Sequence, residues 1–257
     1  MMTQSKDIAR AMVDSRAAGR DWPLPSQAIE GLDVDIAYEI QRELVAQRLS
    51  SDEVAGFKAG ATSAPAQRML GLEAPFTGVL FANGRRENGV SIAATDFRGL
   101  VLETELCFRI GSAIARRVPD VKALREHIDA CRPAIELADA GGYGAAKFTG
   151  LDLIAGNGAS AAVLLGAEAD WQSPAIDELA VSFSRDGELL HEAMSGDLMG
   201  GQWQALLWLV NAVIDQGYEL EPGHLLLTGS LGSGHPGLPG RYVADYGAFG
   251  RIAFDVA

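Results

Sequence analysis

Three glutamates of this chain lie in apolar segments, where carboxylates are uncommon. Glu103 and Glu105 stand two positions apart in the run 101–110, so on a strand both side chains point to the same face. Glu136 is a third carboxylate inside the apolar segment 133–137. Like charges side by side repel, and apolar neighbours leave that repulsion poorly screened. Three convergent carboxylates suit a hard divalent ion such as Mg²⁺ or Mn²⁺; the alternative is a solvated strand face with a nearby Lys or Arg as counter-charge.

A lysine occupies the middle of a glycine-flanked, otherwise apolar segment. Residues 56–63 read Gly-Phe-Lys-Ala-Gly-Ala-Thr-Ser. Lysine is rarely buried without a partner, and glycines on both sides let backbone or ligand approach closely. Lys58 could therefore bind a substrate carboxylate or enolate, or move a proton. An edge-strand lysine that discourages aggregation is the alternative. The segment lacks the glycine spacing of a P-loop.

A glycine-rich and serine-rich loop follows the apolar run 225–227. Residues 228–236 read Thr-Gly-Ser-Leu-Gly-Ser-Gly-His-Pro, and such a loop exposes several backbone N–H groups that can hold an oxyanion or a carboxylate. An ordinary flexible turn is the alternative interpretation. His235 is a candidate base, but the sequence assigns it no partner acid. The signatures of serine hydrolases, zinc proteases and dinucleotide-binding folds are absent from the sequence.

Composition limits the kind of partner. The 257 residues carry 21 basic and 34 acidic side chains, a formal net charge of −13, which argues against nucleic acid or an anionic membrane as partner. Cys107 and Cys131 lie in apolar surroundings and are expected to be buried and unpaired. The N-terminus lacks the apolar core of a signal peptide, and no run approaches the roughly 20 apolar residues of a membrane span. We expect a cytoplasmic enzyme, and the 48% hydrophobic content favours a homo-oligomer.

The order of predicted elements favours an α+β fold. Helical spacing covers residues 3–18 and 33–50, with Asp33 as a cap and the Pro-rich stretch 22–25 as connector. Beyond them, β-rich runs alternate irregularly with two further helical segments, and Asp186-Gly187 marks a hairpin turn. We therefore predict an N-terminal helical segment (1–50) and a mixed-β catalytic domain (51–257), with peripheral helices. The β-rich runs are 54–62, 89–92, 100–110, 133–138, 160–165, 179–184, 224–230 and 250–256; the helical segments are 119–130 and 201–216.

Taken in order, four of these motifs resemble those of one enzyme family. Residues 56–63 are similar to its G-[FWY]-K-x-G-x-T-S strand, residues 103–105 to its E-x-E, residues 133–136 to its P-A-I-E and residues 228–231 to its [ST]-G-S-L loop. The family is that of the 2-keto-4-pentenoate hydratases and 4-oxalocrotonate decarboxylases, within the fumarylacetoacetate hydrolase superfamily. The resemblance runs from about residue 33 to the C-terminus. It implies the mixed β-sheet roll of that superfamily's C-terminal domain.

The resemblance also implies a site and a reaction. Glu103, Glu105 and Glu136 would bind Mg²⁺ or Mn²⁺, and Lys58 and Ser230 would be catalytic residues. The substrate would be a short 2-hydroxydienoate, or its 2-oxo tautomer, from the catabolism of aromatic compounds. The metal-polarised 2-oxo group would stabilise a dienolate, which serves hydration, decarboxylation or C–C cleavage alike. The implied substrate-binding residues are Thr62, Asn157, Ser160, Thr228, Gly229 and Leu231.

This chain departs from the family pattern where water would be handled. The acidic residue of the family's D-F-G-like turn is absent from residues 74–78, and Gly156 stands where the family's A-D-N-A-S motif has its aspartate. The Ser and Arg of the family's D-S-R are missing after Asp139. We expect a hydratase first, with a 4-oxalocrotonate-type decarboxylase or a C–C bond hydrolase as the alternative. A non-catalytic binding or assembly subunit is the alternative of another class.

Overall fold

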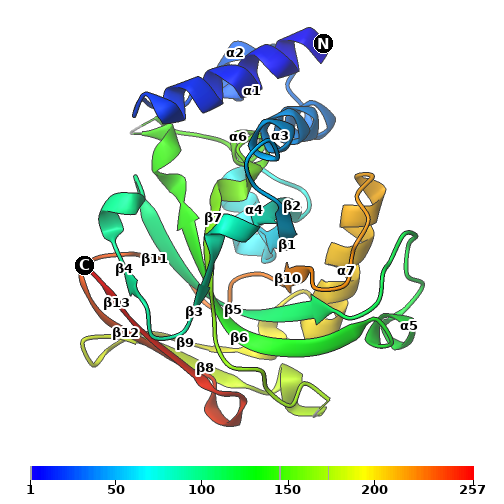
Figure 1. Ribbon diagram of the computed structural model, residues 1–257, viewed down its shortest axis with the longest axis vertical. Coiled ribbons are helices and arrows are strands. Elements are labelled where there is room, and N and C mark those ends of the chain that lie inside the picture. Colours follow the sequence, from blue (N-terminus) through cyan, green and yellow to red (C-terminus); the bar gives the residue numbers. More distant parts are fainter. Residues whose placement is uncertain (1, 145, 173) are drawn as a thin grey trace.

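The computed structural model contains an eight-stranded mixed sheet that lies beneath a group of N-terminal helices (Figure 1). The candidate site lies on this sheet. The structure describes residues 2–144, 146–172 and 174–257. The sheet runs in the order β2-β1-β10-β5-β6-β7-β3, with β11 paired to β5, and β2 also contacts β7, so the sheet curls into a roll. Its strands are β1 (Val54–Gly60), β2 (Phe76–Phe81), β3 (Arg85–Glu87), β5 (Leu100–Ile110), β6 (Ile128–Asp139), β7 (Ser160–Leu165), β10 (Leu225–Leu227) and β11 (His235–Pro236).

Alternation along the strands separates the inside of the roll from its outside. Inside, a small apolar cluster joins the two ends of the sheet, with Leu80 from β2 and Val163 from β7. Outside, the neighbouring residue Val79 belongs to the main hydrophobic core, as does Phe81. This period of two is what strand geometry dictates for a sheet that is covered on both faces.

A second, five-stranded sheet packs beside the roll in the order β4-β13-β12-β8-β9. Its strands are β4 (Ser91–Ile92), β8 (Ala180–Arg185), β9 (Glu188–Met194), β12 (Gly240–Asp245) and β13 (Arg251–Val256). Asp186 and Gly187, with φ of +52° and +84°, form the two-residue turn between β8 and β9. Positive φ at both positions is what a type I′ hairpin requires. The hairpin predicted at this dipeptide is confirmed.

The helices cover the ends of the roll. α1 and α3 pack together above β2 with α6, and Asp33 caps α3 by accepting from the Ile36 N–H at 2.9 Å. α7 packs its apolar face into the main core. The helices are α1 (Met2–Ala17), α2 (Pro25–Ala28), α3 (Val34–Arg48), α4 (Ala64–Leu70), α5 (Val121–Arg125), α6 (Gly150–Ala155) and α7 (Gln202–Asp215). No helix in the described part of the chain is long and apolar enough to cross a membrane.

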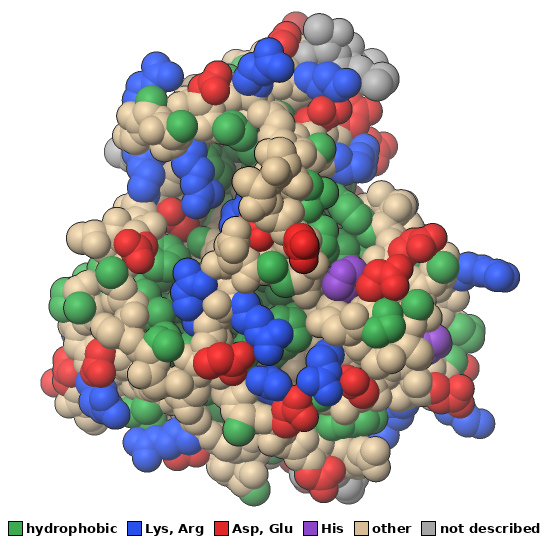
Figure 2. All heavy atoms as spheres, in the orientation of Figure 1, with side chains coloured by type: hydrophobic (Ala, Val, Ile, Leu, Met, Phe, Trp, Pro, Cys, Tyr) green, Lys and Arg blue, Asp and Glu red, His purple; other side chains and the backbone are tan. Residues whose placement is uncertain are grey.

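The predicted class, an α+β fold with a curled mixed sheet and peripheral helices, is confirmed. The extents of two predicted elements are wrong for one reason: the helix at 119–130 shrinks to α5 and the strand at 133–138 lengthens to β6, because β6 already begins at Ile128 to pair with the whole length of β5. Tertiary pairing here overrides local helical spacing. The strands β2 and β12 and the short helices α4 and α6 were not predicted. Acidic and basic side chains are interspersed over the face seen in Figure 2.

Candidate metal centre and substrate cavity

The three glutamates converge inside the roll. Glu103 and Glu105 point to the same face of β5, and Glu136 on β6 is the direct partner of Glu103 across the antiparallel pair. One carboxylate oxygen from each residue lies within 4.8 Å of the other two. Glu105 and Glu136 are fully buried, and Glu103 is partly exposed. The strand register therefore brings together, in one buried cluster, the carboxylates that the sequence singles out.

Lys58 enters the same cluster from β1. Its Nζ lies 2.6 Å from Glu136 Oε1, and its side chain is only 4% exposed. Two glycines make room for it: a Cβ on Gly158, where φ is +62°, would lie 3.0 Å from Lys58 Cε, and a Cβ on Gly78 would lie 3.3 Å from Lys58 Cγ. The structure thus places Lys58 against the carboxylates and not on an exposed edge.

Burial and mutual repulsion change the acidity of the cluster. Burial, together with the charge of Glu136, raises the pKa of Glu103 to about 7. Burial and the charges of Glu136 and Glu103 raise the pKa of Glu105 well above its ordinary value. Burial by itself would lower the pKa of Lys58, but the charges of Glu136 and Glu103 outweigh it, so the pKa of Lys58 is raised. Lys58 is therefore a cation held by the carboxylates around it.

The cluster retains both charge and oxygen atoms for a further cation. When all three carboxylates are ionised, they and the single ammonium group carry a formal charge of −2, which a divalent ion neutralises. Glu105 Oε1 and Glu136 Oε2 are buried without a hydrogen-bond partner among the described residues. Buried carboxylate oxygens normally have hydrogen-bond partners, so two such oxygens without partners mark positions suited to an ion. The donor set fits Mg²⁺ or Mn²⁺, since both prefer oxygen ligands.

The loop after β10 supports the cluster from one side. The Gly229 N–H, at φ +115°, donates to Glu105 Oε2 at 2.8 Å and so orients that carboxylate. Thr228 donates its hydroxyl to Gln202 Oε1 at 2.6 Å, which ties the loop to α7. Leu231 is buried, and its backbone exchanges hydrogen bonds with Thr104. Ser230 differs from these three, because its buried hydroxyl has no partner among the described residues.

A cavity of about 710 Å³ opens beside Glu103. Ser230, Leu231 and Thr62 border it, so three of the predicted substrate-side residues share one wall with a candidate metal ligand. Its other wall comes from β9 and the 3₁₀ turn Ser195–Asp197, which contribute the acidic side chains Glu192 and Asp197. No local pattern marks these two acids, because they are exposed residues that reach the cavity only through the packing of the second sheet.

Two predicted substrate-binding residues lie elsewhere. The Asn157 amide forms two hydrogen bonds with the Val79 backbone, accepting at 2.7 Å and donating at 2.9 Å, so it fastens the turn after α6 to β2. Ser160, at the start of β7, borders a separate cavity on the side of the N-terminal helices. The structure therefore does not bring Asn157 and Ser160 to the cavity beside Glu103.

A histidine pair, which includes the candidate base His235, lies behind the carboxylates on the opposite face of β5. His191 Nε2 is 3.1 Å from Thr104 Oγ1, and His191 Nδ1 is 2.8 Å from His235 Nε2, with the two rings stacked. Thr104 in turn donates to the Leu231 carbonyl at 2.7 Å. His235 therefore points away from the cavity and helps to hold the loop, and it is not a candidate base for the site.

The chain is similar in sequence to known hydratases and decarboxylases. The chain is 29% identical over 226 residues to a 4-oxalocrotonate decarboxylase from a Pseudomonas species, covering 87% of this chain and 86% of that protein. It is 26% identical over 237 residues to a 2-keto-4-pentenoate hydratase from Paraburkholderia xenovorans, covering 89% and 86%. The predicted family resemblance is confirmed. No family model matches the chain.

Solved structures show the same fold. A 4-oxalocrotonate decarboxylase from Pseudomonas putida G7, complexed with magnesium and adipate, superposes with a TM-score of 0.92 at 18% identity, covering 100% of this chain and 98% of that one. A fumarylpyruvate hydrolase from Pseudomonas aeruginosa, in complex with Mn²⁺ and pyruvate, gives a TM-score of 0.58 at 16% identity, covering 78% and 88%. The chain thus has the fold that these two enzymes share, as the resemblance implied.

Proposed function

We propose that this protein is a divalent-metal-dependent lyase that acts on short 2-oxo or 2-hydroxydienoic acids, with hydration of a 2-hydroxypenta-2,4-dienoate as its first expected reaction. The buried cluster of Glu103, Glu105 and Glu136 with Lys58 carries the proposal. Burying three carboxylates together is unfavourable unless they bind a cation. A protein with a purely structural role gains nothing from such a cluster. The similarity to named hydratases and decarboxylases supports the substrate class.

The three glutamates would hold Mg²⁺ or Mn²⁺ through oxygens that include the two without partners. Such an ion, when bound, supplies Lewis-acid polarisation of the 2-oxo group of a substrate. The protein's own contribution is a dry, preorganised set of ligands, with Glu105 oriented by the Gly229 N–H and Glu136 by Lys58.

Lys58 and Ser230 would handle the substrate's oxygen atoms. Lys58 carries a proton on Nζ inside the cluster, where it can donate a hydrogen bond to a developing enolate oxygen or return a proton to carbon. Ser230 offers a buried hydroxyl without a partner, on the wall shared with Glu103, and it can donate to the substrate carboxylate. A polar group of this kind holds the 2-oxo acid end of the substrate in one orientation.

Decarboxylation is the second candidate, and Phe76 is the observation that favours it. Its ring is buried, and a Cβ on Gly60 or Gly158 would collide with it; on Gly158 that Cβ would also touch Lys58 Cε. The aromatic ring therefore fills the space next to the lysine with apolar surface. Glu73, the nearest acidic residue in the sequence, is exposed. Such surroundings suit loss of CO₂, which needs an electron sink but no base to position water.

The proposal includes a cytoplasmic location and a homo-oligomeric state. The two cysteines are free and buried, as is usual in a reducing compartment. The apolar share of the composition, 48%, favours contact between copies. Size-exclusion chromatography with light scattering tests the oligomer, and fractionation of the native cells tests the location.

Turnover measurements on both substrates test the activity. We expect the purified protein with Mg²⁺ or Mn²⁺ to consume 2-hydroxypenta-2,4-dienoate or to release CO₂ from 4-oxalocrotonate, and EDTA to abolish the reaction. Glu105→Gln should lose activity, whereas Glu87→Gln, a change at an exposed glutamate, should retain it. If neither substrate is consumed with any divalent metal, the enzyme proposal is wrong and the non-catalytic binding subunit remains.

A further inference from the structure

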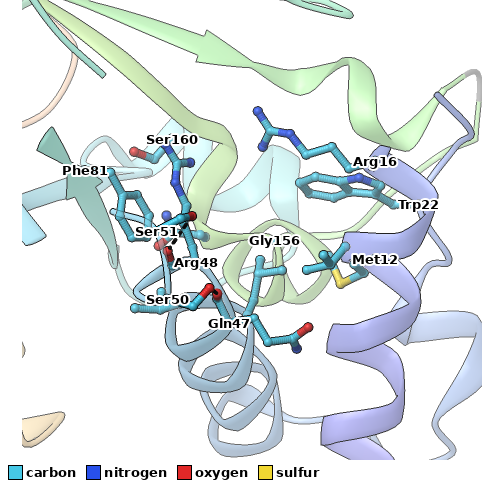
Figure 3. A pocket seen from close by; sticks show the side chains of 14 residues that line it. Met12, Arg16, Trp22, Gln47, Arg48, Ser50, Ser51, Phe81, Gly156 and Ser160 are labelled. Atoms are coloured by element: carbon cyan, nitrogen blue, oxygen red, sulfur yellow. Dashed lines mark hydrogen bonds between the residues drawn. The ribbon is translucent and has the colours of Figure 1, made fainter. Parts of the chain in front are cut away.

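A second cavity lies on the outer side of the roll, under the N-terminal helices (Figure 3). It has a volume of about 440 Å³ and lies between α1, α3, the end of β2 and the start of β7. Among the residues that the structure describes, none borders both this cavity and the one beside Glu103. Phe81, one of its walls, points to the outside of the roll, whereas the candidate metal cluster lies inside. We call it the helix cavity.

The helix cavity has an apolar lining and basic residues at its rim. Aliphatic, thioether and aromatic side chains make up most of the lining, and Arg16 and Arg48 are its charged members. In Figure 3 both guanidinium groups extend to the same side of the cavity, where Ser160 also lies. The surface beneath the N-terminal helices is hollowed, with basic side chains beside the hollow (Figure 2). The apolar lining residues are Met12, Val13, Trp22, Leu44, Val45 and Phe81.

The two arginines are held differently. Arg48 lies 4.0 Å above the Phe81 ring centre and forms an ion pair with Asp52 at 3.3 Å, so its position is fixed. Arg16 has no acidic partner within ion-pair distance among the described residues. Burial and the nearby charge of Arg16 lower the pKa of Arg48, because like charges repel. The chain has a net charge of −13, so two neighbouring arginines, one of them without an acidic partner among the described residues, form a local positive site. Such a site is suited to binding an anion from solution.

A smaller neighbouring cavity extends the positive region. Its volume is about 200 Å³, and it shares Arg16 and Arg48 with the helix cavity while adding Arg86 on its far wall. Asp96 is the acidic residue on that wall. Two guanidinium groups therefore stand at the junction of an apolar cavity and a polar one, which is where the charged end of a bound molecule would be stabilised.

We propose that the helix cavity is a binding site for an amphipathic carboxylate: an apolar body, such as one aromatic ring, enters the cavity and its carboxylate meets Arg16 and Arg48. The volume falls within the range of ordinary small-molecule sites. The indole ring of Trp22 forms part of the apolar wall that an aromatic body would contact. The proposal rests on this cavity and not on the reaction at the glutamates.

Calorimetric titration with three matched compounds tests the proposal. Phenylacetate carries the ring and a carboxylate, 2-phenylethanol carries the ring without charge, and phenethylamine carries the opposite charge. The protein is kept in EDTA, so that a carboxylate cannot bind through a metal. We expect phenylacetate to saturate one site per chain, and the alcohol and the amine to bind at least about tenfold more weakly, since a charge-assisted hydrogen bond is lost.

Variants then locate the site. Arg16→Gln should weaken phenylacetate binding about tenfold without disturbing the fold, because Arg16 is exposed and unpaired among the described residues. Arg48→Lys should retain the fold and part of the affinity. Arg42→Gln, which removes the same charge from an exposed position of α3 outside the cavity, should bind as the unchanged protein does.

Three results would overturn the proposal. The first is the absence of saturable binding of phenylacetate at millimolar concentration. The second is binding of 2-phenylethanol as tight as that of phenylacetate, or binding of phenylacetate to Arg16→Gln as tight as to the unchanged protein. The third is loss of phenylacetate binding in Glu105→Gln, which would place the compound at the glutamate cluster and not in the helix cavity.

Discussion

Replacing Glu105 with glutamine should have opposite effects on the metal-free and metal-bound protein. Burial and the charges of Glu136 and Glu103 raise the pKa of Glu105 well above 4.5, so native Glu105 holds its proton to higher pH than the unfolded chain does. In the unfolded chain the same group loses its proton near its ordinary pKa. Stability of the metal-free protein therefore falls as pH rises above about 4.5, because the unfolded state releases a proton that the native state retains.

The magnitude follows from that difference. One pKa unit corresponds to about 1.36 kcal/mol, so the free energy of unfolding falls by about that much for each pH unit over which native Glu105 holds a proton that the unfolded chain has lost. Glu105→Gln removes this loss of stability, and its amide oxygen can still accept from the Gly229 N–H. We expect the metal-free variant to be more stable than the unchanged protein at pH 7, by about 1 kcal/mol or more, and equally stable below pH 4.5.

Urea unfolding at pH 4.5 and pH 7, in EDTA and in Mg²⁺, measures both effects. Mg²⁺ should stabilise the unchanged protein strongly at pH 7 and the variant much less, because one ligand is missing. Glu87→Gln, at an exposed position, serves as the control and should change neither. A variant that is no more stable at pH 7 in EDTA, or one that gains as much from Mg²⁺ as the unchanged protein, would refute the reasoning.

Three further outcomes are expected. Lys58→Met should reduce turnover by roughly 10²–10⁴-fold in the metal-loaded enzyme, while Mg²⁺ still raises its melting temperature; retained activity would contradict the role of Lys58. Ser230→Ala should raise KM about tenfold with little change in kcat, and an unchanged KM would remove Ser230 from substrate binding. Mg²⁺ affinity should fall at least about tenfold per pH unit below 7, because Glu103 and Glu105 must both be ionised to bind; titration calorimetry at pH 6 and pH 7 checks this, and an unchanged affinity would contradict it.

The sequence located the cluster because strand geometry acts over short distances. Same-face carboxylates at Glu103 and Glu105 follow from the period of two, and an unpartnered lysine in an apolar run called for an acid near Lys58. That acid proved to be Glu136. Which glutamate approaches the lysine depends on the curl of the sheet, and nothing local in the sequence encodes it.

The residues that line the cavity could not be predicted from the sequence, because tertiary packing brings them together. Glu192 and Asp197 come to the cavity through the second sheet, whose strand β12 carried no strong local signal. Asn157 and Ser160 were assigned through motif similarity, but the amide of Asn157 satisfies the Val79 backbone and Ser160 borders the helix cavity. A motif match predicts the region of the fold in which a residue lies. The hydrogen bonds of the folded chain determine which of its polar atoms remain available to a ligand.

Solvent-deuterium exchange at C3 of a short 2-oxo acid tests the central claim most directly, because exchange requires the enolate but no added water or lost CO₂. With 2-oxopentanoate in D₂O, proton NMR should show exchange well above the uncatalysed rate in Mg²⁺ or Mn²⁺. EDTA and Glu105→Gln should each return it to the uncatalysed rate, and Glu87→Gln should not. Exchange that persists in EDTA, or no exchange with either metal, would contradict metal-dependent enolate chemistry at the three glutamates.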